Sequence, residues 1–507
     1  MPSYEPVIGL EVHAELLTQS KMFCGCAVVD STSAAPNTVV CEVCAGMPGT
    51  LPVINERAVE FGLRVALALN CEVPGVNVFA RKNYFYPDLP KGYQISQYEL
   101  PLAVNGWLDI ETPAGVKRIR VRRVHLEEDT GKLNHSEEGG AKSDERGSVR
   151  LSPLALRSSL VDLNRAGVPL LEIVTEPDLC SVEEVRAYAT ALRSLLRYLG
   201  VNNGDMEKGV IRFEANISVR PVGSDELRSR TEVKNLNSFK AMERATVYEI
   251  ERQSAVWESG GRVAQETMGW NDAEGVTVSQ RGKEHAHDYR YFPEPDLPPL
   301  ELDRAWIERI RAELPELPAA RRDRFVQALG LTRYDADLLV VERAVAEYFE
   351  AACAVGDAWA APKTVPPKAV ANWITGELFR LMNAGGLTID QIKVTPRALA
   401  GLISLIGAGT INSNTAKIVF EEMFATGQDG GAIVAARGLA QVSDTAEIEA
   451  LIDRVLSANP EQVKTFLGGK ATVEQWFFGQ VMKASQGRGN PQVIRGLLAE
   501  KLKALGG

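Results

Sequence analysis

The sequence has few cysteines and histidines and no long apolar run. It contains seven cysteines and five histidines among 507 residues. An odd and sparse set of cysteines suits a reducing compartment, so a disulfide framework is not expected. No run approaches the roughly 18 consecutive apolar residues of a membrane span. The first residues also lack a basic region followed by an apolar one. We therefore expect a cytoplasmic protein that does not contact membranes.

Several motifs of nucleotide-binding and hydrolytic enzymes are also absent. The chain has no P-loop, no glycine fingerprint of a dinucleotide fold and no kinase catalytic loop. If ATP is used, its phosphates must be held by metal and by Arg, Lys and Asn side chains of a sheet. The chain has no G-x-S-x-G motif and no cysteine nucleophile candidate outside one cluster, which argues against a self-contained amidase or thiol hydrolase.

A net positive charge is absent as well. Lys and Arg number 56 against 66 Asp and Glu, for a formal net charge of −10. This balance excludes a uniformly basic nucleic-acid-binding surface but not a local basic patch. Residues 463–507 hold seven basic and two acidic side chains, which suits contacts with phosphates. The basic residues proposed for such contacts are Lys470, Lys483, Arg488, Arg495 and Lys501.

Length and proline-rich breaks predict three domains. A single core rarely grows beyond about 250–300 residues. The chain is rich in strand patterns up to about residue 295 and mostly helical after the proline-rich stretch 292–299. We predict an α+β domain over 1–295, a helical domain over 296–405 and a small helical tail domain over 406–507.

Alternating segments predict antiparallel strands with one polar face. In segment 7–16 the apolar residues share one face, while the polar face carries Glu11, His13 and Glu15. Segment 210–220 repeats the pattern, with Arg212, Glu214 and Asn216 on its polar face. Alternation of this kind favours an antiparallel sheet. Between these strands, Ser181 is the predicted N-cap of a helix that extends to Leu199.

Four cysteines are spaced as a metal site. The pattern is Cys24-x-Cys26, fourteen intervening residues, then Cys41-x-x-Cys44. Two closely spaced pairs separated by a loop are typical of tetrahedral zinc bound by four thiolates. A closed site of this kind leaves no position for water, so the zinc would be structural. The alternative is four unrelated reduced cysteines.

Carboxylates in three segments are candidates for a magnesium site. Glu11 and His13 share a strand face, an acidic cluster occupies 124–129, and Glu172 lies within an apolar strand. If they converged, they would suit Mg²⁺ in nucleotide chemistry, whereas a solvated outer face is the alternative. The strand faces that could hold nucleotide phosphates carry Arg212, Glu214 and Asn216, and Arg230, Glu232 and Lys234.

Over essentially its whole length the sequence resembles the B subunits of the aspartyl/glutamyl-tRNA amidotransferases, which are heterotrimeric enzymes. The segments that carry the resemblance include VIGLEVHAEL, CEVCAGMPGTLPVIN, RKNYFYPDLPKGYQISQYE, HLEEDTGKLNH, VDLNRAGVPLLEIVTEPD and GQVMKASQGRGNPQ. The resemblance implies that the first domain is a cradle similar to glutamine synthetase, built on an antiparallel sheet. It also implies that the tail domain contacts tRNA.

The resemblance implies ATP- and Mg²⁺-dependent phosphorylation of the side-chain carboxylate on Glu-tRNA(Gln) or Asp-tRNA(Asn). Ammonia released by the amidase partner of the heterotrimer then gives Gln-tRNA(Gln) or Asn-tRNA(Asn), and a third, small partner chain completes the enzyme. Some members lack the four cysteines, so zinc is not needed for the chemistry. Two alternatives remain: an RNA-independent ATP-dependent carboxylate–amine ligase, which would not need a basic tail, and a non-catalytic RNA-binding or assembly factor, which would not need the carboxylate set.

The site residues follow from the same resemblance. The implied Mg²⁺ ligands are Glu11, His13, Glu128 and Glu172, with Glu127 as a catalytic neighbour. Lys82, Asn83 and Tyr84 are expected near the route of ammonia. Nucleotide binding by Arg212, Glu214, Asn216 and Lys234 is instead inferred from the strand faces.

Overall fold

The computed structural model describes residues 4–135, 159–282, 289–354, 365–441, 445–470, 472–485 and 489–506. The chain forms two compact units, Met1–Leu317 and Pro318–Gly507. The first unit combines a large sheet with helices, and the second unit is helical. This confirms the predicted α+β class, in which helical domains follow the sheet domain along the chain. In the described ranges no helix has both the length and the apolar character needed to cross a membrane.

An eight-stranded sheet is the framework of the first unit. Its neighbouring strands are antiparallel except for the pair β11 and β12, which helix α3 (Phe239–Glu258) connects. The order across the sheet is β13 (Val276–Gly282), β12 (Glu266–Asn271), β11 (Thr231–Leu236), β10 (Ile211–Pro221), β1 (Tyr4–Glu15), β9 (Pro169–Thr175), β6 (Gly115–Glu128) and β5 (Ala103–Thr112).

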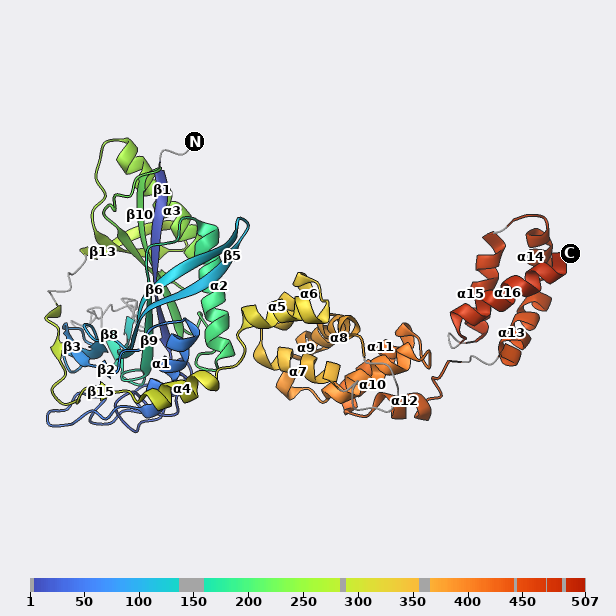
Figure 1. The fold of residues 1–507 in the computed structure, drawn as a ribbon, viewed down its shortest axis with the longest axis horizontal. Coiled ribbons are helices and arrows are strands. Elements are labelled where there is room, and N and C mark those ends of the chain that lie inside the picture. The colour runs from blue at the N-terminus through green and yellow to red at the C-terminus, as the bar shows by residue number, and fades with distance from the viewer. Residues whose placement is uncertain are drawn as a thin grey trace, which may run out of the picture. The chain divides into compact units, whose positions relative to one another are not determined.

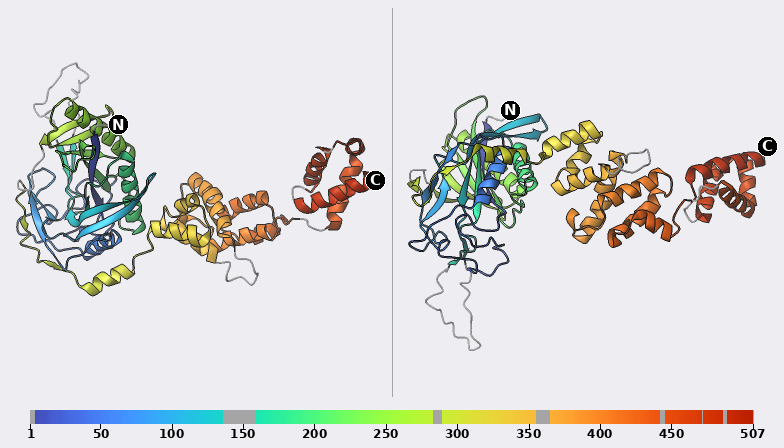
Figure 2. Two further views of the ribbon diagram at one scale, coloured as in Figure 1. Left: turned by 45° about the horizontal axis from the view of Figure 1, so that its top comes forward. Right: turned by 60° about the horizontal axis from the view of Figure 1, so that its bottom comes forward.

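Helices cover the apolar face of this sheet. Ile8, Leu10 and Val12 of β1 are fully buried in a core shared with α1 (Glu56–Ala68), α2 (Val182–Tyr198), α3 and α4 (Arg304–Ala312). Helices α2 and α3 pack against each other on this face (Figures 1 and 2). As predicted, α2 begins after Ser181, whose hydroxyl accepts a hydrogen bond from the amide of Glu184 at 3.2 Å.

The other face of the sheet is polar, and a small sheet stands next to it. The small sheet has the order β14 (Phe292–Pro293), β3 (Phe79–Asn83), β4 (Tyr93–Gln97), and β4 packs against β6. Two further pairs are β15 (Leu300–Glu301) with β2 (Val76–Asn77), and β7 (Lys132–His135) with β8 (Ser159–Asp162).

The second unit contains two separate hydrophobic cores. One core gathers residues between Phe325 and Val434, and the other gathers residues between Ile448 and Leu502. The helices around the first core are α5 (Pro318–Leu329), α6 (Arg333–Leu339), α7 (Arg343–Ala354), α8 (Pro367–Trp373), α9 (Phe379–Gly385), α10 (Pro396–Gly407), α11 (Ser413–Thr426) and α12 (Gly430–Ala436). Those around the second are α13 (Thr445–Ala458), α14 (Pro460–Leu467), α15 (Thr472–Ala484) and α16 (Pro491–Gly506). The predicted boundaries at 295 and 405 stay predictions.

The packing of α2 on the sheet predicts the cost of a cavity. Leu192 is fully buried in the first core, whereas Leu227 is 67% exposed. Leu192→Ala should lower the stability of the first unit by about 2–5 kcal/mol, because it removes buried methyl groups and leaves a void. Leu227→Ala should change it by less than about 0.5 kcal/mol. Denaturant unfolding of both variants measures the difference, and equal shifts would contradict this packing.

Candidate functional site

Four neighbouring strands place one polar side chain each in a row across the sheet. His125 of β6 lies opposite Glu172 of β9, Glu172 lies opposite His13 of β1, and His13 lies opposite Arg212 of β10. Because side chains alternate along a strand, partners in register project from the same face. The row therefore lies on the polar face, away from the helices.

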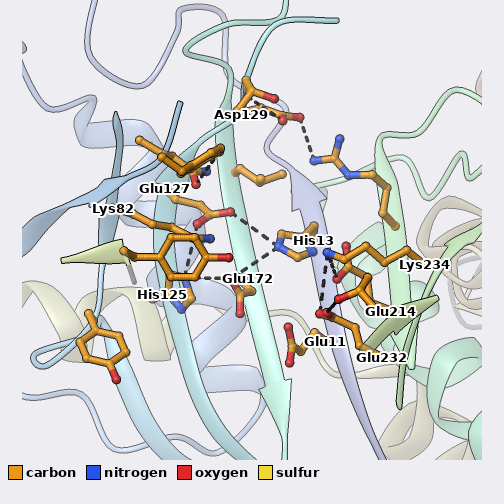
Figure 3. A pocket seen from close by; sticks show the side chains of 18 of the residues that line it. Glu11, His13, Lys82, His125, Glu127, Asp129, Glu172, Glu214, Glu232 and Lys234 are labelled. Carbon is orange, nitrogen blue, oxygen red and sulfur yellow. Dashed lines mark hydrogen bonds and ion pairs between the residues drawn. The ribbon is translucent and has the colours of Figure 1, made fainter. Parts of the chain in front are cut away.

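Two imidazoles and two carboxylates meet at the centre of this row. The Nε2 atom of His13 lies 3.5 Å from Glu172 and 3.7 Å from Glu127, and that of His125 lies 3.2 Å from Glu172 and 3.6 Å from Glu127. Figure 3 shows the ring of His13 facing both carboxylates, with a dashed line to each. Ligand atoms of His13, Glu127 and Glu172 all lie within 4.8 Å of one another, so these three residues could hold a metal ion.

The ionisation of this cluster follows from its buried, mutually compensating charges. Burial alone would lower the pKa of His13, but its hydrogen bond to Glu172 and the surrounding carboxylates raise it to about 9. Burial would likewise raise the pKa of Glu172, but His125 and His13 hold it well below its usual range. A divalent cation could take over the role of the imidazole protons, because metal binding and protonation compete at such sites.

Glu127, and not Glu128, joins His13 and Glu172. The carboxylate of Glu128 pairs with Lys91 and accepts a hydrogen bond from the amide of Ile95 at 2.9 Å. The two glutamates are adjacent in β6, and successive side chains of a strand point to opposite faces. Glu128 therefore faces away from the cluster, and Glu127 is the glutamate of this pair that lies with His13 and Glu172.

A second group of carboxylates lies beside the first. Glu11, Glu214 and Glu232 come from β1, β10 and β11, and their ligand atoms also lie within 4.8 Å of one another. Lys234 lies 2.7 Å from Glu214 and 3.7 Å from Glu232 (Figure 3). Asn216 donates a hydrogen bond to Glu11 at 2.9 Å. The expected ligand Glu11 thus belongs to a group separate from His13 and Glu172.

Both groups open into one cavity of about 470 Å³ on the polar face. The predicted residues that line it are Glu11, His13, Lys82, Tyr84, Glu127, Glu172, Arg212, Glu214, Arg230, Glu232 and Lys234. Asn83 instead donates hydrogen bonds to the carbonyls of Tyr289 and Arg290, at 3.1 and 2.8 Å, which ties β3 to the segment beside it. Lys82 lies 5.2 Å from the ring centre of Tyr289 and 5.8 Å from that of Tyr84.

The cavity also has a basic corner. Arg212 donates a hydrogen bond to Asp129 at 2.8 Å, and Arg165 lies 3.6 Å from the same carboxylate. Burial would raise the pKa of Asp129, but the two guanidinium groups lower it to about 2. The carboxyl group of Glu15 also faces Asp129 and the two arginines, and burial together with Asp129 raises its pKa to about 8. With Glu15 protonated at neutral pH, the corner keeps a positive balance, which suits a phosphate group.

Several residues that line the cavity received no individual role from the sequence, namely Arg123, His125, Asp129, Arg165 and Tyr291. His125 and Asp129 belong to the acidic cluster 124–129, which the sequence marked as a candidate. Alternation along β6 and the residue after it could have singled out Arg123, His125 and Asp129, because they follow the spacing of Glu127. Arg165 and Tyr291 lie outside the strands of the large sheet, where no periodic pattern marks them.

The four predicted cysteines form a cluster. Cys44 Sγ lies 3.6 Å from the sulfur atoms of Cys24 and Cys41 and 3.7 Å from that of Cys26. Four thiolates at about 2.3 Å from a tetrahedral zinc ion would be about 3.8 Å apart. The cluster therefore fits a metal ion such as zinc.

The basic residues of the tail differ in their surroundings. Lys470, Lys483 and Arg495 are exposed on the second core's helices and its turns. Lys501 pairs with Asp453 at 2.7 Å, so its charge is already compensated. Arg488 lies outside the described residues.

Comparisons with known proteins extend over the whole chain. A GatB/GatE catalytic domain model matches residues 6–308, and a GatB domain model matches residues 347–502. Curated relatives named as the B subunits of aspartyl/glutamyl-tRNA(Asn/Gln) amidotransferases include a protein of Carboxydothermus hydrogenoformans, 49% identical over 505 residues and 100% of both chains. One of Moorella thermoacetica is 52% identical over 98% of this chain and 100% of its own. A third, from Geobacter sulfurreducens, is 50% identical over 99% of this chain and 100% of its own.

Metal titration should separate the two adjacent glutamates. Glu127→Gln should weaken Mn²⁺ binding by at least about tenfold, because it removes a charged ligand from the cluster. Glu128→Gln should leave the affinity within about twofold, since its carboxylate faces Lys91. Calorimetric titration of the full chain with Mn²⁺ measures both. If Glu128→Gln lowered the Mn²⁺ affinity more than Glu127→Gln does, Glu128 would be the metal ligand, as expected from the sequence.

Zinc content should depend on the clustered cysteines alone. We predict one zinc ion per chain by elemental analysis, and Cys44→Ser should reduce it to less than about half, because a hydroxyl is a poor zinc ligand. Cys180→Ser is the matched control, since Cys180 is exposed and lies outside the cluster. Equal zinc content in both variants would contradict the assignment.

Proposed function

The chain belongs to the family of aspartyl/glutamyl-tRNA(Asn/Gln) amidotransferase B subunits, and on this premise we propose that its cavity phosphorylates and then amidates the side-chain carboxylate of Glu or Asp carried by tRNA. Family membership confirms the resemblance found in the sequence. The observation that carries the proposed chemistry is the imidazole–carboxylate cluster beside a basic corner in one cavity.

The reaction needs activation because a carboxylate is a poor acyl donor. Transfer of the γ-phosphoryl group of ATP to a carboxylate oxygen gives an acyl phosphate and ADP. The nitrogen of ammonia then attacks the carbonyl carbon, the carbon–oxygen bond to phosphate breaks, and a proton leaves the nitrogen. The products are the amide and inorganic phosphate. Charge on the transferred group must be neutralised in both steps.

The cavity residues divide this work by their charge. His13, Glu127 and Glu172 would hold Mg²⁺, which would neutralise phosphate charge. Arg212 and the corner around Asp129 would bind phosphate oxygens. The ammonium group of Lys82, which lines the same cavity, would orient the substrate carboxylate for phosphorylation.

The remaining carboxylate group would serve a second cation or the nucleotide. Glu11, Glu214 and Glu232 could hold a divalent ion. The ion would neutralise the carboxylate charge that the ammonium group of Lys234 neutralises in the structure. The pKa of Lys234 is raised, because the carboxylates of Glu214 and Glu232 outweigh its burial. Nucleotide binding by Arg212, Glu214, Asn216 and Lys234 is retained in this proposal, with Asn216 acting through its hydrogen bond to Glu11.

Partners follow from the family and from the chemistry. We infer a heterotrimer with an amidase and a third, small chain, because this chain's motifs offer no glutaminase nucleophile of its own. The exposed Lys470, Lys483 and Arg495 support contacts of the tail with tRNA phosphates, as does Arg488 by its charge.

Conversion of aminoacyl-tRNA tests the proposal. The chain assembled with its amidase and small partner chains should convert Glu-tRNA(Gln) to Gln-tRNA(Gln) with ATP and glutamine. Glu172→Gln should slow this by at least about a hundredfold, with ammonium chloride as well as with glutamine, because charge stabilisation at the phosphoryl group is lost. Thin-layer separation of the released amino acids measures the conversion.

The matched control is Glu176→Gln, because Glu176 follows the same strand but pairs with Arg122 outside the cavity. It should retain the wild-type rate within about twofold, as surface substitutions usually do. Equal turnover of free glutamate would favour the RNA-independent ligase. No conversion by an assembled complex would contradict the proposal.

A further inference from the structure

The cysteine-bearing segment is joined to a loop that enters the cavity. We call residues 21–44 the knuckle and residues 161–167 the loop. Asn37 donates to the carbonyl of Val161 at 2.9 Å and accepts from the amide of Leu163 at 2.8 Å. The side chain of Asn164, only 1% exposed, accepts from the amide of Val39 at 2.9 Å and donates to the carbonyl of Ala35 at 2.7 Å. The two segments thus hold each other through reciprocal hydrogen bonds.

Lys21 joins the same two segments at the metal cluster. Its ammonium group is fully buried and lies 2.9 Å from the carbonyl of Val39, 3.3 Å from that of Leu163 and 3.5 Å from Cys44 Sγ. An ammonium group has three donors, and here each meets one acceptor. Four thiolates around one zinc ion carry two negative charges in excess, so the cluster would supply the counter-charge that a buried ammonium group requires. Metal binding would therefore hold Lys21, and through it the loop, in place.

The loop presents Arg165 to the cavity. Arg165 donates from Nε to the carbonyl of Thr130 at 3.0 Å and from Nη2 to that of Gly131 at 2.8 Å. These bonds use two of its five N–H donors, and the side chain lines the cavity beside Asp129. The amide of Gly167 also donates to the carbonyl of Asp129 at 2.9 Å. The loop is thus bound to the knuckle on one side and to the basic corner on the other.

We propose that Arg165 binds a phosphate group of ATP, and that the knuckle is a device that positions it through Asn164 and Lys21. The proposal rests on the proposed function, because it needs a phosphorylated ligand in the cavity. Through this connection a structural metal would strengthen ATP binding without touching the substrate. Arg165 is the binding residue, whereas Asn164 and Lys21 are positioning residues.

A double-mutant cycle on the full chain tests the connection. Arg165→Met should raise the dissociation constant for ATP with Mg²⁺ by about tenfold, since a charged hydrogen bond is lost. Asn164→Ala should raise it by about three- to tenfold, because the loop is released. The double variant should stay within about twofold of Arg165→Met, because one residue acts through the other. Equilibrium titration with ATP measures all four proteins.

Asn77→Ala is the matched control for general destabilisation. Asn77 is fully buried and donates to the carbonyl of Pro101 at 2.7 Å, away from the knuckle and the cavity lining. Its ATP affinity should equal that of the wild type. The proposal would be overturned if the increases in the ATP dissociation constant caused by Asn164→Ala and Arg165→Met multiplied in the double variant, because the two residues would then act independently.

Removal of zinc tests the same connection without any substitution in the knuckle. After treatment with a zinc-selective chelator and renewed Mg²⁺, the wild-type chain should bind ATP about tenfold more weakly, and added zinc should restore the affinity. Arg165→Met should bind ATP equally with and without zinc. If zinc removal weakened ATP binding by Arg165→Met as much as it weakens binding by the wild type, the positioning role would be overturned. A wild-type chain that binds no ATP at all would instead overturn the proposed function, and this inference with it.

Discussion

The buried carboxylates on one face of an antiparallel sheet set the main constraint on this structure. Glu127 and Glu172 are almost completely buried, and a buried charge is costly unless a partner compensates it. His13 and His125 supply that compensation from strands on both sides of Glu172. The sheet therefore holds a buried cluster whose carboxylates are compensated by two imidazoles, and a divalent cation could replace the imidazole protons. The apolar face, packed under α1, α2 and α3, keeps the strands in the register that brings these groups together.

Elements outside the large sheet complete the cavity. The small sheet of β14, β3 and β4 contributes Lys82, and the loop before β9 contributes Arg165. Arg165 lies 3.6 Å from Asp129. Burial alone would lower the pKa of Lys82, but the carboxylates of Glu127 and Glu172 raise it, so the cavity brings cations and carboxylates close together. Phosphoryl transfer needs both, because a metal–nucleotide complex carries positive and negative groups within a few ångströms. The fold thus combines a sheet that carries the candidate metal ligands together with Arg212 and Lys234, and attached segments that add Lys82 and Arg165.

The alternation of polar and apolar residues predicted the strands of this site, but it did not predict which side chains gather in each carboxylate group. Alternation identified the polar faces of β1 and β10, and both are observed. It could also have shown that Glu127 and His125 share a face while Glu128 does not. Family resemblance implies a ligand role for Glu128, whereas in the structure its carboxylate pairs with Lys91. Local alternation accounts for the directions of both glutamates, because a strand reverses the side chain at every residue.

The sequence by itself determined the local features: which segments alternate as strands, where Ser181 caps a helix, and which four cysteines are spaced for a metal. Each depends on residues close together in the chain, where backbone geometry relates spacing directly to direction. Only the tertiary structure decided that Glu11 joins Glu214 and Glu232 while His13 joins Glu127 and Glu172. The same is true of Arg165, which reaches the cavity from a loop fastened to the knuckle. Such groupings depend on the register between strands that are distant in sequence, and that register is set by packing of the whole core.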